Sequence, residues 1–252
     1  MKKPATILLP SFLVLISCGK PSPPRDYTKI EMVAVPAGEF KMGGNDNRLR
    51  TVTLDCFWIG KTDITVAEFK AYCTVARIDF NKFKAPDWGW RDDHPMVNVS
   101  WQEARDYCKW AGGDLPTEAQ WEKAARGTDG REYPWGDEYD ANKLCCSKKK
   151  FRDANSTERV GSYPSGASPY GCLDMAGNVW QWCLDWRSED SHAPLTEGLN
   201  PTGPKSGERH VIKGHSWNYW NDESFRSAAA GASVPTLRGD GTGFRLVRSS
   251  AR

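Results

Sequence analysis

The sequence predicts an α+β fold that is rich in loops and has only a few helices. Three motifs of a hydroxyl residue followed three positions later by Glu or Gln precede amphipathic stretches, as they do at helix N-termini. Short runs of β-type residues near the start of the folded part predict strands. The 252 residues also include 12 Trp, 23 Gly and 16 Pro. This composition indicates irregular segments held by large rings, in a chain long enough to bury a sizeable core.

Two β-type stretches open the folded part. Residues 32–35 have the pattern of a strand, the Pro36-Ala37-Gly38 turn follows, and residues 39–43 continue the β pattern. We expect these two stretches to form a hairpin or a strand pair. Residues 52–59 are expected to form the next strand.

Three helices are expected next. Each begins at a capping box, in which a hydroxyl and a later carboxylate or amide satisfy free backbone amides. The boxes are Thr65-x-x-Glu68, Ser100-x-x-Glu103 and Thr117-x-x-Gln120. The apolar residues after each box repeat at helical spacing, so we expect them to face the core rather than a cofactor.

Regular patterning fades after Gly127. Residues 172–182 predict a strand that enters a buried aromatic cluster, and a polar loop over residues 188–209 follows. The C-terminal segment, residues 211–248, has a period of neither 2 nor 3.6 between its framing motifs, so it predicts a long loop carried on a scaffold. No internal repeat or strong linker divides residues 31–252, which we expect to form one domain.

The N-terminus resembles the export signal of bacterial lipoproteins. Met1-Lys2-Lys3 is a short cationic start, and the apolar run after it is too short to span a bilayer comfortably as a helix. The run ends in Leu15-Ile16-Ser17-Cys18, which is similar to a lipobox. The resemblance implies a signal peptide over residues 1–17, lipidation of Cys18, a tether over residues 18–30, and anchoring to a bacterial membrane at the outer surface. Isoleucine before Ser17 departs from the commonest pattern, so an ordinary secretory signal is the alternative.

The net charge argues against nucleic-acid binding, and the spacing of the cysteines and histidines argues against a zinc site. A net charge of +2, from 34 basic and 32 acidic residues, gives no electrostatic basis for binding nucleic acid. Seven cysteines remain after Cys18 in a chain expected to be exported, where disulfides form, and the odd number leaves at least one without a partner in the same chain. Neither the cysteines nor the four histidines have the spacing of a zinc site.

Six motifs, in the same order along the chain, resemble those of one family. They are Val35-Pro36-Ala37-Gly38-x-Phe40-x-Met42-Gly43, His94-Pro95-Met96-Val97-Asn98-Val99-Ser100-Trp101, Leu115-Pro116-Thr117-Glu118-Ala119-Gln120-Trp121-Glu122, Tyr133-Pro134-Trp135-Gly136, Asp174-Met175-x-Gly177-Asn178-Val179-Trp180 and Gly243-Phe244-Arg245. Over about residues 31–248 the chain is similar to the formylglycine-generating-enzyme (sulfatase-modifying-factor) domain. The resemblance implies a C-type lectin fold of the formylglycine-generating-enzyme type.

The same resemblance indicates where catalysis would lie. Oxygen-using members of the family carry two cysteines, five residues apart, after a Gly-Gly-Ser-Trp motif, and these cysteines bind copper and handle the substrate thiol. The corresponding positions here are Tyr219 and Ser224, and neither side chain is a soft thiolate ligand. We therefore expect no catalysis and no cofactor apart from calcium. An exported modifying enzyme with an altered active site is the alternative.

A calcium site is a further implication of the family. Calcium-binding relatives hold one ion against the loop that corresponds to residues 174–181. The ligands here would be Asp174, Gly177, Val179 and Gln181, and the carboxylate of Asp174 is a suitable hard ligand. Gln181 replaces the family's terminal Glu, which lowers the charge of the ligand set. The alternative is that Asp174 and Gln181 are hydrogen-bonded turn residues without a metal.

A second branch of this fold fits the chain better: the variable proteins of diversity-generating retroelements, in particular a treponemal lipoprotein of this kind. In those proteins adenine-specific mutagenesis rewrites the C-terminal segment, whose exposed side chains bind ligand. Mutated asparagine codons (AAY) cannot yield Lys, Trp or Glu, so Lys213, Trp217, Trp220 and Glu223 are expected to belong to a constant frame. The positions that such codons can yield, and that we expect to bind ligand, are His215, Asn218, Tyr219, Asn221, Asp222, Ser224, Phe225, Ala230, Gly231, Ala232, Ser233, Val234, Leu237, Gly239, Asp240 and Gly241.

The implied function is the binding of an unidentified ligand at the surface, and the aromatic residues of the segment favour a protein as that ligand. The frame must supply the folding energy so that the loop can vary. Its expected aromatic support is Trp180, Trp182, Trp217 and Phe244, with Arg226 and Arg245 bonded to loop carbonyls. A structural lipoprotein of the same fold, without diversification, is a further alternative.

The lipobox can be tested by one substitution. If Cys18 carries acyl chains, Cys18→Ala should move the protein from the detergent phase to the aqueous phase of a phase-partition assay, or block its processing, because the acyl chains are what hold it in the membrane. An unchanged distribution of the variant between the two phases would count against lipidation.

Overall fold

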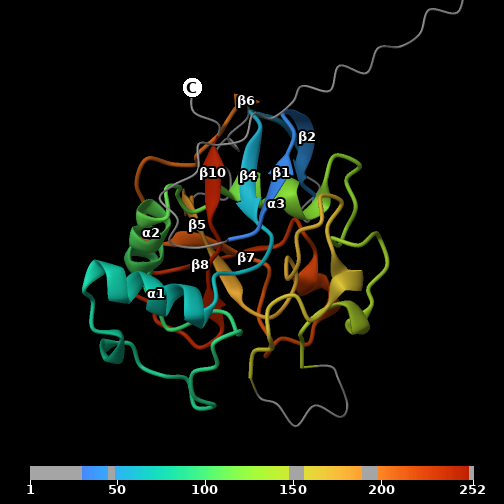
Figure 1. The fold of residues 1–252 in the computed structure, drawn as a ribbon. Coiled ribbons are helices and arrows are strands. Elements are labelled where there is room, and N and C mark those ends of the chain that lie inside the picture. The colour runs from blue at the N-terminus through green and yellow to red at the C-terminus, as the bar shows by residue number, and fades with distance from the viewer. Residues whose placement is uncertain (1–29, 45–48, 148–155, 189–197, 250–252) are drawn as a thin grey trace, which may run out of the picture.

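The computed structural model describes residues 30–44, 49–147, 156–188 and 198–249 (Figure 1). The expected signal peptide, Cys18 and the tether up to residue 29 lie outside these ranges. Three small β-sheets and three α-helices form the framework of the described part, and long irregular segments join them. No helix within the described ranges is long and apolar enough to cross a membrane.

The first sheet joins the two ends of the described chain. It consists of β1 (Met32–Val35), β4 (Phe57–Gly60) and β10 (Val247–Ser249), with both outer strands antiparallel to the central β4. The three arrows lie side by side in Figure 1. Val33 and Val247 both lie opposite Ile59, so one central strand fixes the first and the last strand.

The second sheet consists of β2 (Gly38–Gly43), β3 (Leu49–Leu54) and β6 (Gly198–Leu199). β2 is antiparallel to β3, and β6 is parallel to it. Alternate residues of β2 and β3, such as Phe40 and its partner Val52, are buried. This alternation is the pattern of a sheet with one face on the core.

Two strand predictions need correction. The stretches over residues 32–35 and 39–43 are strands but do not pair with each other, because the turn at Gly38 (φ +127°) sends β1 and β2 into different sheets. The single strand expected over residues 52–59 is two strands, β3 and β4. The exposed Asp55 lies between them, and each of the two pairs with its own neighbours.

The third sheet carries the C-terminal segment. Its order is β8 (Ala230–Ser233), β7 (His210–Lys213), β5 (Trp180–Trp186) and β9 (Thr242–Gly243), where β9 is parallel to β5 and the other pairs are antiparallel. The strand expected over residues 172–182 starts only at Trp180. The residues before it include Asp174, Gly177 and Asn178, all with positive φ, which is incompatible with a strand.

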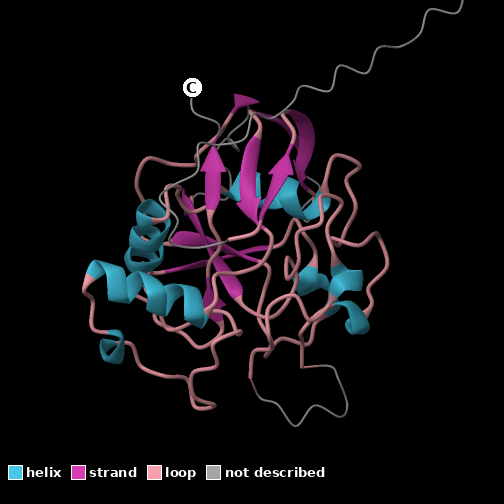
Figure 2. Ribbon diagram, viewed as in Figure 1, coloured by secondary structure: helices cyan, strands magenta, loops and turns pink. Residues whose placement is uncertain are grey.

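The three predicted helices are confirmed. They are α1 (Val66–Ala76), α2 (Trp101–Trp110) and α3 (Glu118–Arg126), and all three capping boxes are formed as expected. α1 and α2 lie together on one side of the molecule in Figure 1. The opposite side is mostly loop (Figure 2). Its short 3₁₀ turns include η2 (Ala141–Lys143) and η3 (Pro164–Gly166); η1 (Phe80–Lys82) follows α1, and η4 (Asp222–Phe225) belongs to the C-terminal segment.

An aromatic core lies between α1, α2 and the C-terminal strands. Phe69 of α1 stacks on Tyr107 of α2 with ring centroids 5.6 Å apart, and Phe244 meets both rings edge to face. Trp182 and Phe244 are fully buried, and Trp180 is nearly so, which confirms them as aromatic support. Trp217 is only half-buried in the turn that follows β7, so it is not the buried support that was expected.

Arg245 confirms its expected role of binding loop carbonyls. Its guanidinium is fully buried and donates to the carbonyl oxygens of Gly60 (2.9 Å) and Leu173 (2.9 Å), to the Gln181 side chain (2.6 Å), and to Asp63 (3.3 Å). The single side chain therefore joins the end of β4, the loop before β5 and β5 itself. Arg226 does not have this role. It pairs instead with Glu132 at 3.1 Å on the surface, where both side chains remain partly exposed.

Four of the described cysteines lie in two clusters of the core. Cys73 and Cys108 lie in the cluster between α1 and α2, and Cys172 and Cys183 lie in the cluster under the first two sheets. All four are buried thiols, and burial raises the pKa of each. They pack as small apolar side chains.

Phe244→Ala should lower the free energy of unfolding by about 3–5 kcal/mol, because it leaves a cavity against Phe69 and Tyr107. Val75→Ala, at an exposed position on α1, should change it by less than about 0.5 kcal/mol. Denaturant unfolding of both variants measures the difference. Equal losses would show that Phe244 is not a core residue.

The buried carboxyl of Asp185, in β5, contacts the start of α3 and predicts that stability depends on pH. Asp185 accepts a hydrogen bond from the backbone N–H of Glu118 (2.8 Å), and burial raises its pKa to about 7. An unfolded Asp ionises near about 3.9, so the folded state keeps a proton that the unfolded state releases. The stability this group contributes is complete below about pH 4 and is lost as the pH rises through about 7.

Asp185→Asn keeps the acceptor oxygen and removes the titration. Denaturant unfolding at pH 4, 5.5 and 7 should therefore show the variant gaining stability relative to the wild type as pH rises. At about 1.4 kcal/mol per pKa unit, the gain can reach about 4 kcal/mol. Stability curves that stay parallel across this pH range would contradict a raised pKa.

Candidate functional site

The C-terminal segment is built on the third sheet. It leaves β7 at Gly214 and turns through His215, both with positive φ. Gly214 is required there because a Cβ would lie 3.1 Å from the ring of Trp121. A tight turn follows, in which the N–H of Tyr219 donates to the carbonyl of Ser216 (3.1 Å). The chain then forms η4, returns as edge strand β8, and re-enters the sheet at β9.

The two clusters of predicted ligand-binding residues, 215–225 and 230–241, converge at Trp180. The ring of Trp180 contacts Tyr219 edge to face (centroids 5.8 Å apart) and lies 3.8 Å from the ring of His215, both in the first cluster. From the second cluster, a Cβ added to Gly231 would lie 3.1 Å from the same indole, and the carbonyl of Gly241 accepts the N–H of Trp180 (2.8 Å). The two clusters therefore form one contiguous surface, which we call the C-terminal surface.

Exposure divides the predicted ligand-binding positions into three groups. Asn218, Tyr219, Asn221 and Val234 are exposed. Nine positions are half-buried: Asp222, Ser224, Ala230, Gly231, Ala232, Ser233, Leu237, Gly239 and Asp240. The remaining three, His215, Phe225 and Gly241, are buried, so the prediction that they face a ligand is wrong.

The buried positions have clear physical reasons. Phe225, 1% exposed, ends η4 and packs with Tyr133, Leu144 and Cys146 in a separate small core. The ring of His215 lies between those of Trp180, Tyr219 and Phe225, and burial lowers its pKa to about 3.

Two glycines are also restricted. A Cβ at Gly241 would lie 3.0 Å from the hydroxyl of Ser216. A side chain at Gly231 would have to displace Trp180 or Ile212, each 3.1 Å from the added Cβ.

The residues expected to belong to the constant frame differ in burial. Lys213 is fully buried, pairs with Glu122 at 3.2 Å, and donates to the carbonyl of Ala228 (3.2 Å), so it joins β7 to α3 and to the segment before β8. Trp220 is 68% exposed and Glu223 is also exposed. These two do not support the fold. They lie on the C-terminal surface beside the predicted ligand-binding positions.

The positions of the family's cysteine pair hold no thiol. Tyr219 packs on Trp180 and His215, and its carbonyl oxygen accepts the N–H and the hydroxyl of Ser147 (3.0 and 2.8 Å). Ser224 lies in η4, where its N–H donates to the carbonyl of Asn221. Among the described residues, no group of three or more His, Cys, Asp or Glu side chains could hold a metal ion.

The predicted calcium loop is internally hydrogen-bonded. Asp174 accepts the N–H of Gly161 (2.7 Å), and Gln181 donates to the carbonyl of Asp174 (2.7 Å). The side-chain oxygen of Gln181 accepts from Trp121 and from Arg245, each at 2.6 Å. Gly177 is held by its N–H to Gly214, and Val179 is fully buried. These bonds favour the interpretation of Asp174 and Gln181 as turn residues, and calcium binding stays a prediction.

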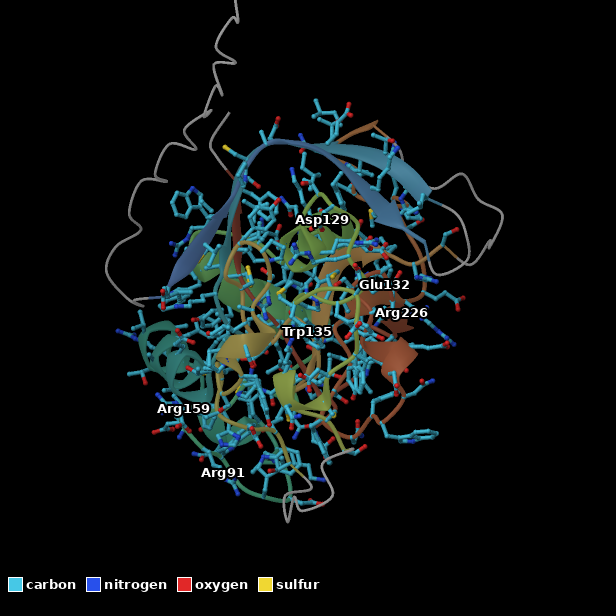
Figure 3. The ribbon with its side chains drawn as sticks, turned by 90° about the vertical axis from the view of Figure 1, so that its right-hand side faces the viewer. Arg91, Asp129, Glu132, Trp135, Arg159 and Arg226 are labelled. Atoms are coloured by element: carbon cyan, nitrogen blue, oxygen red, sulfur yellow. The ribbon has the colours of Figure 1, made fainter. Side chains whose placement is uncertain are left out.

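Two ion pairs fix the margins of the C-terminal surface. Arg238 pairs with Glu103 of α2 at 3.0 Å, and Arg226 pairs with Glu132 at 3.1 Å. Figure 3 shows Arg226 and Glu132 next to each other, on the same side of the molecule as Trp135. Both arginines are thus matched by a carboxylate within the chain. The groups that the surface exposes then include aromatic and amide side chains, together with the carboxylate of Glu223.

Comparison with known proteins places this arrangement in a family. A model described as the sulfatase-modifying factor enzyme 1-like domain matches residues 19–250. The formylglycine-generating enzyme of Thermomonospora curvata is 33% identical over 86% of this chain and 92% of the relative. The solved structure of PvdO from Pseudomonas aeruginosa has a TM-score of 0.74 at 26% identity, covering 86% of this chain and 94% of that one. The Treponema denticola variable protein 1 has a TM-score of 0.71 at 24% identity, covering 87% and 95%, and shares the fold.

The fold is thus α+β and of the C-type lectin type found in formylglycine-generating-enzyme domains, as the motifs predicted. The matched region includes the whole C-terminal surface and the frame beneath it. The chain belongs to the family of sulfatase-modifying factor enzyme 1-like domains.

Proposed function

We propose that the protein is a non-catalytic binding protein whose C-terminal surface recognises another protein. The observation that carries the proposal is the exposure of large apolar side chains on a buried frame. Among the described residues, six large apolar side chains are strongly exposed, and three of these, Tyr219 (40%), Trp220 (68%) and Val234 (45%), lie in the C-terminal segment. Exposed apolar groups gathered in one region are typical of interaction sites.

The side chains of the surface fit a protein ligand. Tyr and Trp provide large contact areas at a low cost in conformational entropy. Asn218 and Asn221 stand beside them as hydrogen-bonding groups, and the cations of Arg226 and Arg238 are paired with Glu132 and Glu103. Aromatic anchors with adaptable polar neighbours are the composition of protein-binding loops.

The frame and the surface have separate roles in this proposal. Lys213, Trp180 and Arg245 make their contacts below the surface, whereas Asn218 and Tyr219 project from it. Substitutions of the projecting side chains would therefore alter the ligand and leave the fold intact. We infer that these positions are diversified, as the variable proteins that the sequence resembles are. We also infer that Cys18 anchors the domain to the outer surface of a bacterial membrane, where such a site would meet its ligand.

A second candidate is an exported modifying enzyme with an altered active site. It is favoured by the similarity to formylglycine-generating enzymes over most of the chain. Against it stand Tyr219 and Ser224, which supply no thiolate for copper or for a substrate thiol.

A randomised library tests the binding proposal. Seven positions at or near the surface, Asn218, Tyr219, Asn221, Asp222, Val234, Leu237 and Asp240, would be varied together and the proteins displayed for selection on immobilised lysozyme. We expect binders to be selected, with melting temperatures within about 5 °C of the parent, because exposed side chains contribute little to stability. Thermal unfolding and binding to lysozyme are the measurements.

The control library varies His215 and Phe225, which lie in the same segment but are buried. Most of its members should fail to fold, because a core ring is lost. The proposal is overturned if the seven-position library yields no folded binders. It is also overturned if the purified protein, supplied with copper and oxygen, converts a cysteine-containing peptide.

Diversification can be tested separately, from the DNA that surrounds the gene. Adenine-specific mutagenesis requires a template repeat that differs from the coding sequence of the C-terminal segment only at adenines, together with a reverse transcriptase. Both should lie beside the gene. If neither is found there, binding by a fixed surface remains and diversification is ruled out.

A further inference from the structure

The loop over residues 84–90 lies outside the C-terminal segment, but it contacts the C-terminal surface at Trp217 and is linked to it a second time through Asn98. The ring of Trp88 meets that of Trp217 edge to face, with centroids 5.4 Å apart and planes at 87°. On the other side, the side-chain amide of Asn98 donates to the carbonyl of Lys84 (3.0 Å), and the backbone N–H of Asn98 donates to the carbonyl of Gly239 (3.1 Å). The loop is thus connected to both clusters of the surface.

The position of Trp217 depends on this contact. Its backbone N–H donates to the carbonyl of Asn178 (3.0 Å), but its indole Nε1–H is buried without a hydrogen-bond partner within the described ranges, so packing orients the ring. Trp88 lies on one side of the ring, and on another a Cβ added to Gly241 would lie 3.8 Å from the indole nitrogen. Trp88 therefore holds the residue that precedes the exposed Asn218 and Tyr219.

The same loop contains a second tryptophan with a different environment. Trp90 packs on Phe80, with centroids 5.4 Å apart, and on the core cluster between α1 and α2. A turn separates the two rings: Gly89, with φ +75°, donates its N–H to the carbonyl of Pro86 (2.8 Å). Both rings are partly buried, but Trp90 anchors the loop to the core, whereas Trp88 lies against Trp217 at the margin of the surface.

We propose that Trp88 is a constant contact residue of the recognition surface, supplied by a segment that is not diversified. The inference rests on the proposed function and deepens it. A fixed indole beside variable positions would provide contact area to any protein ligand, and tryptophan is enriched among the residues that dominate binding energy. The variable side chains would then determine which protein is bound. Trp88 also positions Trp217, and through it the turn that carries Tyr219.

The lysozyme binders from the seven-position library provide the test. Trp88→Ala in such a binder should raise the Kd for lysozyme by at least about tenfold, and Trp88→Phe should restore most of the affinity, because a ring can still meet Trp217. The matched control is Trp90→Ala, in the same loop, which should leave the Kd within about twofold while lowering the melting temperature. The inference is overturned if Trp88→Ala leaves the Kd unchanged, or if Trp90→Ala raises it equally.

A second selection distinguishes a role of Trp88 in binding the ligand from a role in stabilising the fold. Position 88 is randomised together with the seven positions, and one pool is selected for lysozyme binding while another is selected only for resistance to protease. Aromatic residues should be enriched at position 88 in the binding pool alone. Equal enrichment in both pools would mean that Trp88 serves only the fold, and the inference would fail while the proposed function stands. A library without binders overturns both.

Discussion

The structure depends on the buried guanidinium of Arg245. A fully buried arginine is stable only if its donors are satisfied, because desolvating a charge without partners costs far more than a single contact returns. Here the carbonyl oxygens of Gly60 and Leu173 satisfy them, together with the side chains of Gln181 and Asp63. One side chain therefore joins the end of β4, the loop before β5 and β5 itself. This is how a fold with short strands and long loops obtains a defined shape.

A second buried side chain, Lys213, connects the base of the C-terminal surface to the rest of the fold. Lys213 ends β7 directly before the C-terminal surface begins, and its ammonium group bonds to Glu122 of α3 and to the carbonyl of Ala228. An ion pair that solvent does not reach thus ties β7 to α3, and the bond to Ala228 holds the segment before β8. Because these bonds use no side chain of the exposed positions, the exposed residues can change without weakening them. The frame and the surface occupy the same segment but draw on different residues.

The relation to formylglycine-generating enzymes is consistent with this separation. In this chain Tyr219 packs on Trp180, and its carbonyl oxygen accepts the N–H and the hydroxyl of Ser147. Neither Tyr219 nor Ser224 supplies a thiolate. Tyr219 contributes an exposed ring that stands on Trp180.

The sequence alone determined the helices and the family. Thr65, Ser100 and Thr117 begin helices because capping depends on residues only three positions apart. The exposure of individual residues in the C-terminal segment was decided only by tertiary structure. Phe225 is buried by Tyr133 and Cys146, and Trp88 reaches Trp217 from more than a hundred residues away. An aperiodic loop has no repeating face from which burial can be inferred, so distant contacts decide which side chains meet solvent.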